Sequence, residues 1–260
     1  GLGDVYKRQD MDKETFIKEV NEGLLPPPNY FPLNVKMNKE GYADLDAVIE
    51  TGKHALSSGA FEILANETGA IVLDVRHHND YIKGHIPRSI FIGLDGGFAP
   101  WVGTLIADVK QPILLVADDE RVEEAVTRLS RVGFDNTIGY LAGGFDAWKK
   151  ASKEIDSLVS VSATTLKADL EKDSIHIFDM RKTTEYDSGH IPIAENTPLD
   201  FINHHLAEFP ADKPFYVHCA GGYRSVIAAS ILKSRGIHNV IDVAGGFNAC
   251  LLYTSPSPRD

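Results

Sequence analysis

A cysteine that precedes two glycines and an arginine is the feature of this sequence that most clearly indicates chemistry. Cys219 follows the apolar residues 214–218 and stands just before a stretch with helical spacing. The loop that joins them consists of Ala220, Gly221, Gly222, Tyr223, Arg224 and Ser225. Glycines let the backbone curl so that successive N–H groups point inward, and such a cradle at a helix N-terminus binds anions. We therefore expect this loop to hold Cys219 as a thiolate or persulfide and to bind its substrate.

The helix N-terminus alone is too weak to hold Cys219 as an anion. A helix N-terminus typically contributes about 0.3 to 1 kcal/mol, so the loop amides and the guanidinium of Arg224 would have to supply the rest through charge-assisted hydrogen bonds. Cys219 and Arg224 are accordingly the predicted catalytic residues. The alternative, a buried and unreactive cysteine, is disfavoured by the Gly-Gly-x-Arg run that follows Cys219.

Three residues upstream of the loop are predicted to support it. Asp179 and Arg181 close an expected strand, at the sheet edge where open α/β sheets bind ligands. We interpret them first as an ion pair that braces the loop, and second as direct substrate contacts. His190 is interpreted as a structural histidine bonded to backbone. His204 and His205 are adjacent rather than spaced as ligands on one face, so we expect no metal there.

The sequence repeats itself, and the repeat indicates how these residues are positioned. Sliding the chain over itself places residues 70–76 on 175–181, residues 84–87 on 189–192, and residues 142–145 on 244–247. Two copies of one domain are therefore predicted, at residues 52–150 and 158–249, with a linker at residues 151–160.

Each copy alternates short apolar runs with stretches of helical spacing. The expected strands are residues 71–75, 112–117, 175–180, 214–218 and 239–243, and the expected helices are residues 122–131 and 225–234. Gly133 and Gly236 stand just beyond the two helices as stop signals. Continuously apolar strands that alternate with helices indicate an α/β fold with a central parallel sheet flanked by helices.

The first copy keeps the framework but lacks the chemical loop. Residues 112–121 contain no cysteine and no glycine, and the loop is shorter. Asp118, Asp119 and Glu120 would repel an anionic substrate. We interpret the first copy as an inactive domain with a packing or docking role.

At these residues the chain resembles the rhodanese family. Cys219-x-x-Gly222-x-Arg224-Ser225 matches the active loop of the family, and the segment from Asp179-x-Arg181 to residues 189–192 matches its upstream signature. The resemblance implies sulfur transfer in two steps, with Cys219 as the nucleophile that carries a persulfide. Thiosulfate or a thiol persulfide would be the donor, and sulfite, cyanide or a thiol the acceptor. It implies no metal or organic cofactor.

An inactive copy that precedes an active one resembles the C-terminal part of a persulfide dioxygenase-rhodanese fusion. In such fusions a metallo-β-lactamase-fold domain with an iron site comes first. Residues 10–51, with the proline-rich residues 26–32, would then be the tail of that missing domain and a linker. We expect the fragment to contact its own missing N-terminal domain and to hold no iron itself.

Both ends of the chain are interpreted as foreign to the natural protein. Residues 1–9 and 250–260 read as opposite strands of one sequencing adapter, so both are excluded from the fold. The first copy then predicts Trp where Cys250 stands, and the last helix of the second copy would be truncated. Cys219 is left as the single natural cysteine, which is typical of a reducing, cytoplasmic location.

Composition limits the class of partner. The formal net charge is -11 and no basic stripe is present, which argues against nucleic acid. No apolar run approaches the roughly 20 residues that a membrane helix needs. Small sulfur-containing substrates are the expected partners, and whether the chain forms a homo-oligomer is left open.

Two other functions are compatible with parts of the pattern. A His-Cys pair before a glycine-rich loop and an arginine is also similar to protein tyrosine phosphatases. Those enzymes place five residues between cysteine and arginine, whereas only residues 220–223 intervene here, which leaves room for a sulfur atom rather than a phosphate. A non-catalytic interaction module is the other alternative, and it suits residues 52–150 best.

Overall fold

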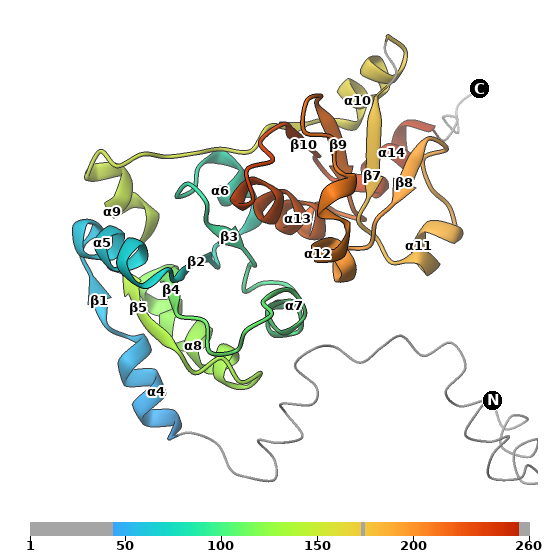
Figure 1. The fold of residues 1–260 in the computed structure, drawn as a ribbon. Helices are drawn as coiled ribbons and strands as arrows, with labels where there is room; N and C mark the ends of the chain where they lie inside the picture. The colour runs from blue at the N-terminus through green and yellow to red at the C-terminus, as the bar shows by residue number, and fades with distance from the viewer. Residues whose placement is uncertain (1–43, 173–174, 255–260) are drawn as a thin grey trace, which may run out of the picture.

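The computed structural model describes residues 44–172 and 175–254, with side chains to residue 251. It contains two five-stranded parallel sheets, each flanked by helices (Figure 1). The strand orders are β1-β5-β4-β2-β3 and β6-β10-β9-β7-β8, so the two sheets share one topology. The predicted α/β fold and the internal repeat are both confirmed.

The first repeat runs from α4 to α9. Its elements are α4 (Leu45–Gly52), β1 (Ala55–Leu56), α5 (Ser58–Thr68), β2 (Ile71–Asp74), α6 (His78–Lys83), β3 (Ile90–Phe91), α7 (Phe98–Leu105), β4 (Ile113–Val116), the 3-10 turn η1 (Asp119–Arg121), α8 (Val122–Ser130), β5 (Thr137–Leu141) and α9 (Gly144–Lys150). The four residues of β4 are all buried, as expected of a central strand covered on both faces.

The second repeat runs from β6 to α14. Its elements are β6 (Ser160–Val161), α10 (Ala163–Leu170), β7 (His176–Asp179), α11 (Thr183–Asp187), β8 (Ala194–Asn196), η2 (Leu199–Phe201), α12 (Ile202–His205), η3 (Leu206–Glu208), β9 (Phe215–His218), α13 (Tyr223–Ser234), β10 (Val240–Val243) and α14 (Gly246–Thr254). The linker between the repeats forms an antiparallel bridge between Asp156 and His85.

Equivalent residues make equivalent contacts in the two repeats. Ser57 caps α5 by accepting a hydrogen bond from Ala60 N, and Ser162 caps α10 by accepting one from Thr165 N. Strand register is also shared, because Asp74 pairs with Val116 in one sheet and Asp179 with His218 in the other. The strand ends that precede Ala117 and Cys219 therefore lie at the same edge of each sheet.

The predicted helix boundaries are close to those observed. Gly133 and Gly236 lie just beyond α8 and α13 with φ of 88° and 89°, in the left-handed region that glycine adopts without strain. Helix α13 begins at Tyr223, two residues earlier than predicted, because Gly222 with φ of 107° completes the turn there.

Helix α13 lies between the two sheets and joins the domains (Figure 1). Residues 225–233 are all buried, and a helix that is buried on every side must have partners all round. Ser230 Oγ accepts a hydrogen bond from Phe91 N at 2.9 Å, and Lys233 Nζ donates to Asp156 Oδ1 at 3.1 Å. One apolar cluster spans both domains, so their packing is continuous.

Several expectations concern residues that fall wholly or partly outside this description. The proline-rich residues 26–32, most of the tail at residues 10–51 and the segment at residues 1–9 all do so. At the other end, Cys250 lies on α14 and packs against the cluster that contains Leu166 and Tyr216. Within residues 44–172 and 175–254, no helix has the length and apolar character needed to cross a membrane.

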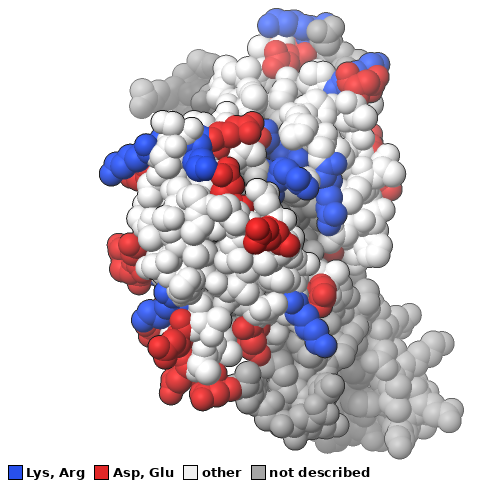
Figure 2. Space-filling model, turned by 60° about the vertical axis from the view of Figure 1, so that its left-hand side comes forward, with Lys and Arg blue, Asp and Glu red and all other residues white. Residues whose placement is uncertain are grey.

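Charged side chains of both signs lie beside one another over much of the face drawn in Figure 2. The charge on that face is therefore mixed rather than gathered into a single sign.

We expect Gly96→Ala to weaken the contact between the domains. An added Cβ would lie 2.3 Å from the ring of Tyr223 on α13. Overpacking of this kind costs about 1 to 3 kcal/mol, so the midpoint of urea unfolding should fall. Gly59→Ala in α5 is the matched control, because its Cβ would meet nothing within 4 Å. An unchanged midpoint for Gly96→Ala would contradict this packing.

Candidate functional site

Cys219 is the first residue after β9 and lies at the carboxyl edge of the second sheet. Its side chain is buried, with 1% of the residue exposed. The Sγ atom accepts a hydrogen bond from Gly222 N at 3.1 Å, across the loop that leads into α13. The thiol therefore sits inside the backbone loop, at the N-terminus of a 12-residue helix.

The first amides of α14 hold the outside of this loop. Phe247 N donates to the carbonyl oxygen of Cys219 at 2.7 Å, and Asn248 N donates to that of Ala220 at 3.0 Å. In a trans peptide the N–H points opposite to the C=O. The amides that follow these two carbonyls, on Ala220 and Gly221, therefore point away from α14, toward the inside of the loop.

A glycine is required where α14 meets the loop. Gly246 has φ of 56°, and a Cβ there would lie 2.3 Å from the carbonyl oxygen of Cys219. Gly144 holds the same place in the first repeat, where a Cβ would lie 3.0 Å from the carbonyl oxygen of Ala117. The close approach of helix and loop is thus shared by both repeats.

Arg224 binds Glu185 of α11 instead of bonding directly to the sulfur. Its Nη1 and Nη2 atoms donate to the two carboxylate oxygens of Glu185 at 2.6 and 2.8 Å. This pair lowers the pKa of Glu185 to about 2 and raises the pKa of Arg224. The negative charge of an ionised Cys219 raises the pKa of Arg224 as well. Arg224 thereby ties the loop to α11 and keeps a fixed positive charge near the thiol.

Asp179 and Arg181 form a buried ion pair next to the loop. Arg181 Nη2 donates to Asp179 Oδ2 at 2.6 Å and to the carbonyl oxygen of Gly189 at 2.8 Å. The guanidinium also lies over the ring of Phe247, 4.0 Å from its centroid. These contacts connect the sheet edge to the start of α14, and the bracing role stays a prediction.

The first repeat contains the same ion pair. Arg76 Nη2 donates to Asp74 Oδ2 at 2.6 Å and to the carbonyl oxygen of Gly84 at 2.9 Å. Its guanidinium lies over Phe145 at 4.3 Å. The ion pair is thus present in a repeat that has Ala117 in place of the cysteine. It therefore stabilises the fold and does not depend on the thiol.

His190 and His218 both make backbone contacts. Nδ1 of His190 lies 3.0 Å from the carbonyl oxygen of Tyr186, and its ring stacks on the Tyr186 ring. His218 is fully buried, with Nε2 at 3.7 Å from Asp179 Oδ2, and burial lowers its pKa. His205 is partnered by Glu208 at 2.8 Å, away from the loop.

Ser225 connects the loop to a buried acid. Its Oγ donates to Asp242 Oδ1 at 2.7 Å, and Ser160 Oγ donates to Asp242 Oδ2 at 2.8 Å. Asp242 is 1% exposed, and burial raises its pKa to about 6. The two serine hydroxyls satisfy the carboxyl group in either protonation state.

Tyr223 points away from the thiol and into the domain contact. Its hydroxyl donates to the carbonyl oxygen of Gly93 at 2.7 Å, and its ring meets the Phe91 ring edge-on at 5.9 Å. The first residue of α13 is thus fixed by the first repeat.

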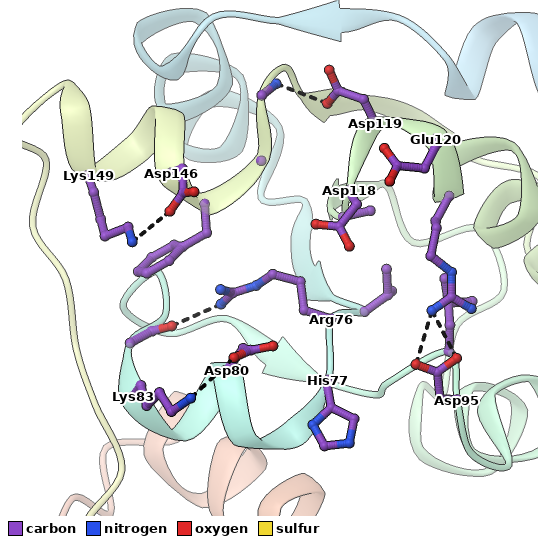
Figure 3. Close-up of a pocket in the computed structure, with 18 of the residues that line it drawn as sticks. Arg76, His77, Asp80, Lys83, Asp95, Asp118, Asp119, Glu120, Asp146 and Lys149 are labelled. Atoms are coloured by element: carbon purple, nitrogen blue, oxygen red, sulfur yellow. Dashed lines mark hydrogen bonds and ion pairs between the residues drawn. The ribbon is translucent and has the colours of Figure 1, made fainter.

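A cavity of about 630 Å³ occupies the matching position in the first repeat (Figure 3). Ala117 stands where the second repeat has Cys219, and three residues rather than four separate it from Arg121. Arg121 pairs with Asp95 at 2.9 Å, and Asp119 accepts a hydrogen bond from Gly143 N at 2.9 Å. Asp118 points into the cavity above Arg76. This loop offers carboxylates where the other offers a thiol and amides.

Two functional partners were missed at the level of sequence. Glu185 lies within the upstream signature but 39 positions from Arg224, and Asp242 lies 17 positions after Ser225. Asp242 is a charged residue inside the apolar run 239–243, which was its available signal, whereas Glu185 stands among polar residues and was marked only by its place in the upstream signature. In the described part of the chain, no group of three or more His, Cys, Asp and Glu residues is arranged to hold a metal ion.

Comparison with known families gives two matches along the chain. Residues 60–151 and residues 162–251 each match the family described as Rhodanese-like domain. A thiosulfate sulfurtransferase, GlpE of Pseudoalteromonas translucida, is 36% identical over 80 residues, which are 31% of this chain and 76% of that protein.

Other relatives match over part of their length. YrkF of Bacillus subtilis is 31% identical over 97 residues, 37% of this chain. The chain spans about half of two Bacillus subtilis relatives, at 52% and 56% of their lengths. The crystal structure of a rhodanese-like domain protein from Staphylococcus aureus is 34% identical, with 36% of this chain and 91% of that chain covered and a TM-score of 0.35.

We expect Asp242 to make the stability of the chain depend on pH. Its pKa is raised from 3.8 to about 6 in the fold, so the folded state binds the proton more tightly. The stability that this proton provides is complete below pH 4 and is lost as the pH rises through 6. Asp242→Asn, which keeps partners for both serines, should remove up to about 3 kcal/mol of that loss.

Urea unfolding at pH 4.5 and 7.5 measures this difference. Asp212→Asn, at an exposed position, is the control and should follow the wild type at both pH values. If Asp242→Asn and the wild type lose the same stability between the two pH values, the buried acid does not titrate as the structure indicates.

Proposed function

The chain belongs to the family of rhodanese-like domain proteins, and on that premise we propose that its second repeat is a sulfurtransferase that carries sulfane sulfur on Cys219. The observation that carries the proposal is the position of the thiol. Sγ lies inside a loop whose amide at Gly222 bonds to it, beside the cation of Arg224. A site of this kind stabilises an anionic sulfur, whether thiolate or persulfide.

In the first step the donor gives its outer sulfur to Cys219. With thiosulfate, the Cys219 thiolate attacks the outer sulfur, a new S–S bond forms, and sulfite leaves with the electron pair of the broken S–S bond. The loop amides then hold the outer sulfur of the persulfide, which bears the negative charge. A thiol persulfide would react in the same way and release a thiol.

In the second step an acceptor removes the outer sulfur. Sulfite, cyanide or a thiol attacks it, and the electron pair of the enzyme S–S bond returns to Cys219 as a thiolate. Both steps are displacements at sulfur that need no external oxidant or reductant. The proposal therefore requires no metal or organic cofactor in this part of the protein.

The size of the loop supports a sulfur substrate over a phosphate ester. Four residues separate Cys219 from Arg224, and Arg224 is already engaged by both oxygens of Glu185. A phosphatase would need that guanidinium to bind two phosphate oxygens.

We propose that the first repeat is an inactive rhodanese domain that supports the second. Ala117 cannot form a persulfide, and Asp118 occupies the cavity that an anionic donor would enter. Tyr223 and Ser230 of α13 are bonded to this repeat, which gives it a positioning role.

The wider setting also remains a proposal. A preceding metallo-β-lactamase-fold domain with an iron site would oxidise persulfides. Contact between that domain and this fragment would allow sulfur to pass to Cys219. The single cysteine of residues 10–249 supports a reducing, cytoplasmic location, with small sulfur compounds rather than nucleic acid or membrane as partners.

We expect the intact mass of the protein to increase by about 32 Da when it is incubated with thiosulfate, because one sulfur atom is added to Cys219. Addition of sulfite or cyanide should return the mass to its starting value. Cys219→Ser should gain nothing, whereas Cys250→Ser should behave as the wild type. Folded protein that gains no sulfur from thiosulfate or from a thiol persulfide would sink the proposal and favour an interaction module.

A further inference from the structure

A second cavity lies where the two repeats meet, beside the active loop. We call it the junction pocket, and its volume is about 310 Å³. Helix α6 of the first repeat lines one side with His78, Asn79 and Lys83. The second repeat lines the other side with Gly222, Asp242 and Gly245. The pocket is thus built from both domains and exists only when they are packed together.

Gly222 connects this pocket to the sulfur. Its amide donates to Cys219 Sγ at 3.1 Å, while a Cβ on the same residue would lie 3.9 Å from His78 Nε2. The imidazole therefore stands over the loop at the residue whose backbone contacts the thiol. A small molecule in the junction pocket would therefore contact both His78 and Gly222, the residue whose amide bonds to Cys219 Sγ.

His78 has the properties of a proton acceptor. It makes no hydrogen bond within the described residues, and it contacts the ring of His77 at 4.1 Å. Burial and the neighbouring His77 lower its pKa, and Asp80 opposes them only weakly. The other charged groups that face the pocket are Lys83, which pairs with Asp80 at 3.6 Å, and the buried Asp242. The ring is therefore neutral near pH 7.

We propose that the junction pocket binds a small thiol as the sulfur acceptor, and that His78 of the first repeat removes its proton. The proposal rests on the persulfide chemistry assigned above to Cys219. It gives the first repeat a catalytic residue in addition to its packing role.

The need for a base distinguishes a thiol from other acceptors. A free thiol has a pKa near ~8.5 and is mostly protonated at pH 7, whereas sulfite is already an anion with a lone pair on sulfur. A cavity of 310 Å³ lies at the small end of the range for ligand sites, which suits a thiol of a few heavy atoms. His78 should therefore matter for thiols and not for sulfite.

The proposed step balances in atoms and electrons. His78 Nε2 takes the proton of RSH, and the thiolate RS⁻ attacks the outer sulfur of Cys219–S–S⁻, whose charge the loop amides hold. A bond forms between the acceptor sulfur and the outer sulfur, the enzyme S–S bond breaks, and its electron pair remains on Cys219 as a thiolate. The proton on His78 then passes to the product RS–S⁻. The sum is Cys219–S–S⁻ + RSH giving Cys219–S⁻ + RS–SH.

The test separates the two half-reactions in His78→Asn. The full chain is loaded with thiosulfate, freed of excess donor, and discharged with 2-mercaptoethanol or with sulfite while the 32 Da adduct is followed by rapid-quench mass spectrometry. We expect loading and discharge to sulfite to match the wild type. Discharge to 2-mercaptoethanol should slow about 100-fold, the usual contribution of a general base.

The pH profile gives a second readout. The rate of discharge of the wild type to 2-mercaptoethanol should rise with pH as His78 loses its proton and then level off. The rate of His78→Asn should instead keep rising toward the pKa of the thiol, because only the free thiolate then reacts. His204→Asn, at an exposed histidine of the second repeat, is the matched control and should behave as the wild type. His78→Gln serves as a second variant should the first fail to fold.

Each outcome has a distinct meaning. A normal rate of discharge to 2-mercaptoethanol in the variants would overturn the role of His78. So would an equal slowing with both acceptors, which would indicate a distorted loop. A wild-type chain that cannot be loaded at all would overturn the sulfurtransferase proposal itself.

Discussion

The hydrogen bonds from the first amides of α14 to the loop carbonyls of Cys219 and Ala220 are the constraint on which the site depends. They turn the peptide planes so that the following amides point away from α14, and they require glycine at position 246 because no Cβ fits there. Phe247, next in the chain, packs on Arg181 and so links the same helix to the buried ion pair with Asp179. The positions of the thiol, the amides and the ion pair are therefore set together.

Comparison of the two repeats distinguishes the residues that maintain the fold from those of the reactive loop. Both keep the Asp-x-Arg pair, the aromatic ring over its guanidinium, and the glycine that lets the last helix approach the loop. They differ at the loop, where Ala117 and three acidic residues replace the thiol and its glycines. The fold therefore does not depend on the thiol and the glycines of the loop. The first repeat instead contacts the second through Tyr223 and contributes His78 to the junction pocket.

Much of this arrangement could be predicted from the sequence, and the exceptions have physical causes. Apolar runs such as residues 214–218 and the stop glycine Gly236 indicated the α/β fold and the strand edge that holds Cys219. The partner of Arg224 was not predictable, because Glu185 meets it only through tertiary packing. The domain contact was also missed, since a repeat pattern does not say which faces meet. The apolar character of α13 on every side was the signal for it.

The most direct test of the central claim is a crystal structure of the chain after treatment with thiosulfate. The account predicts a second sulfur atom bonded to Cys219 Sγ at about 2.05 Å, enclosed by the loop and within hydrogen-bond distance of its backbone amides. A sulfur atom that points out of the loop, or one found on another residue while Cys219 stays unmodified, would contradict it.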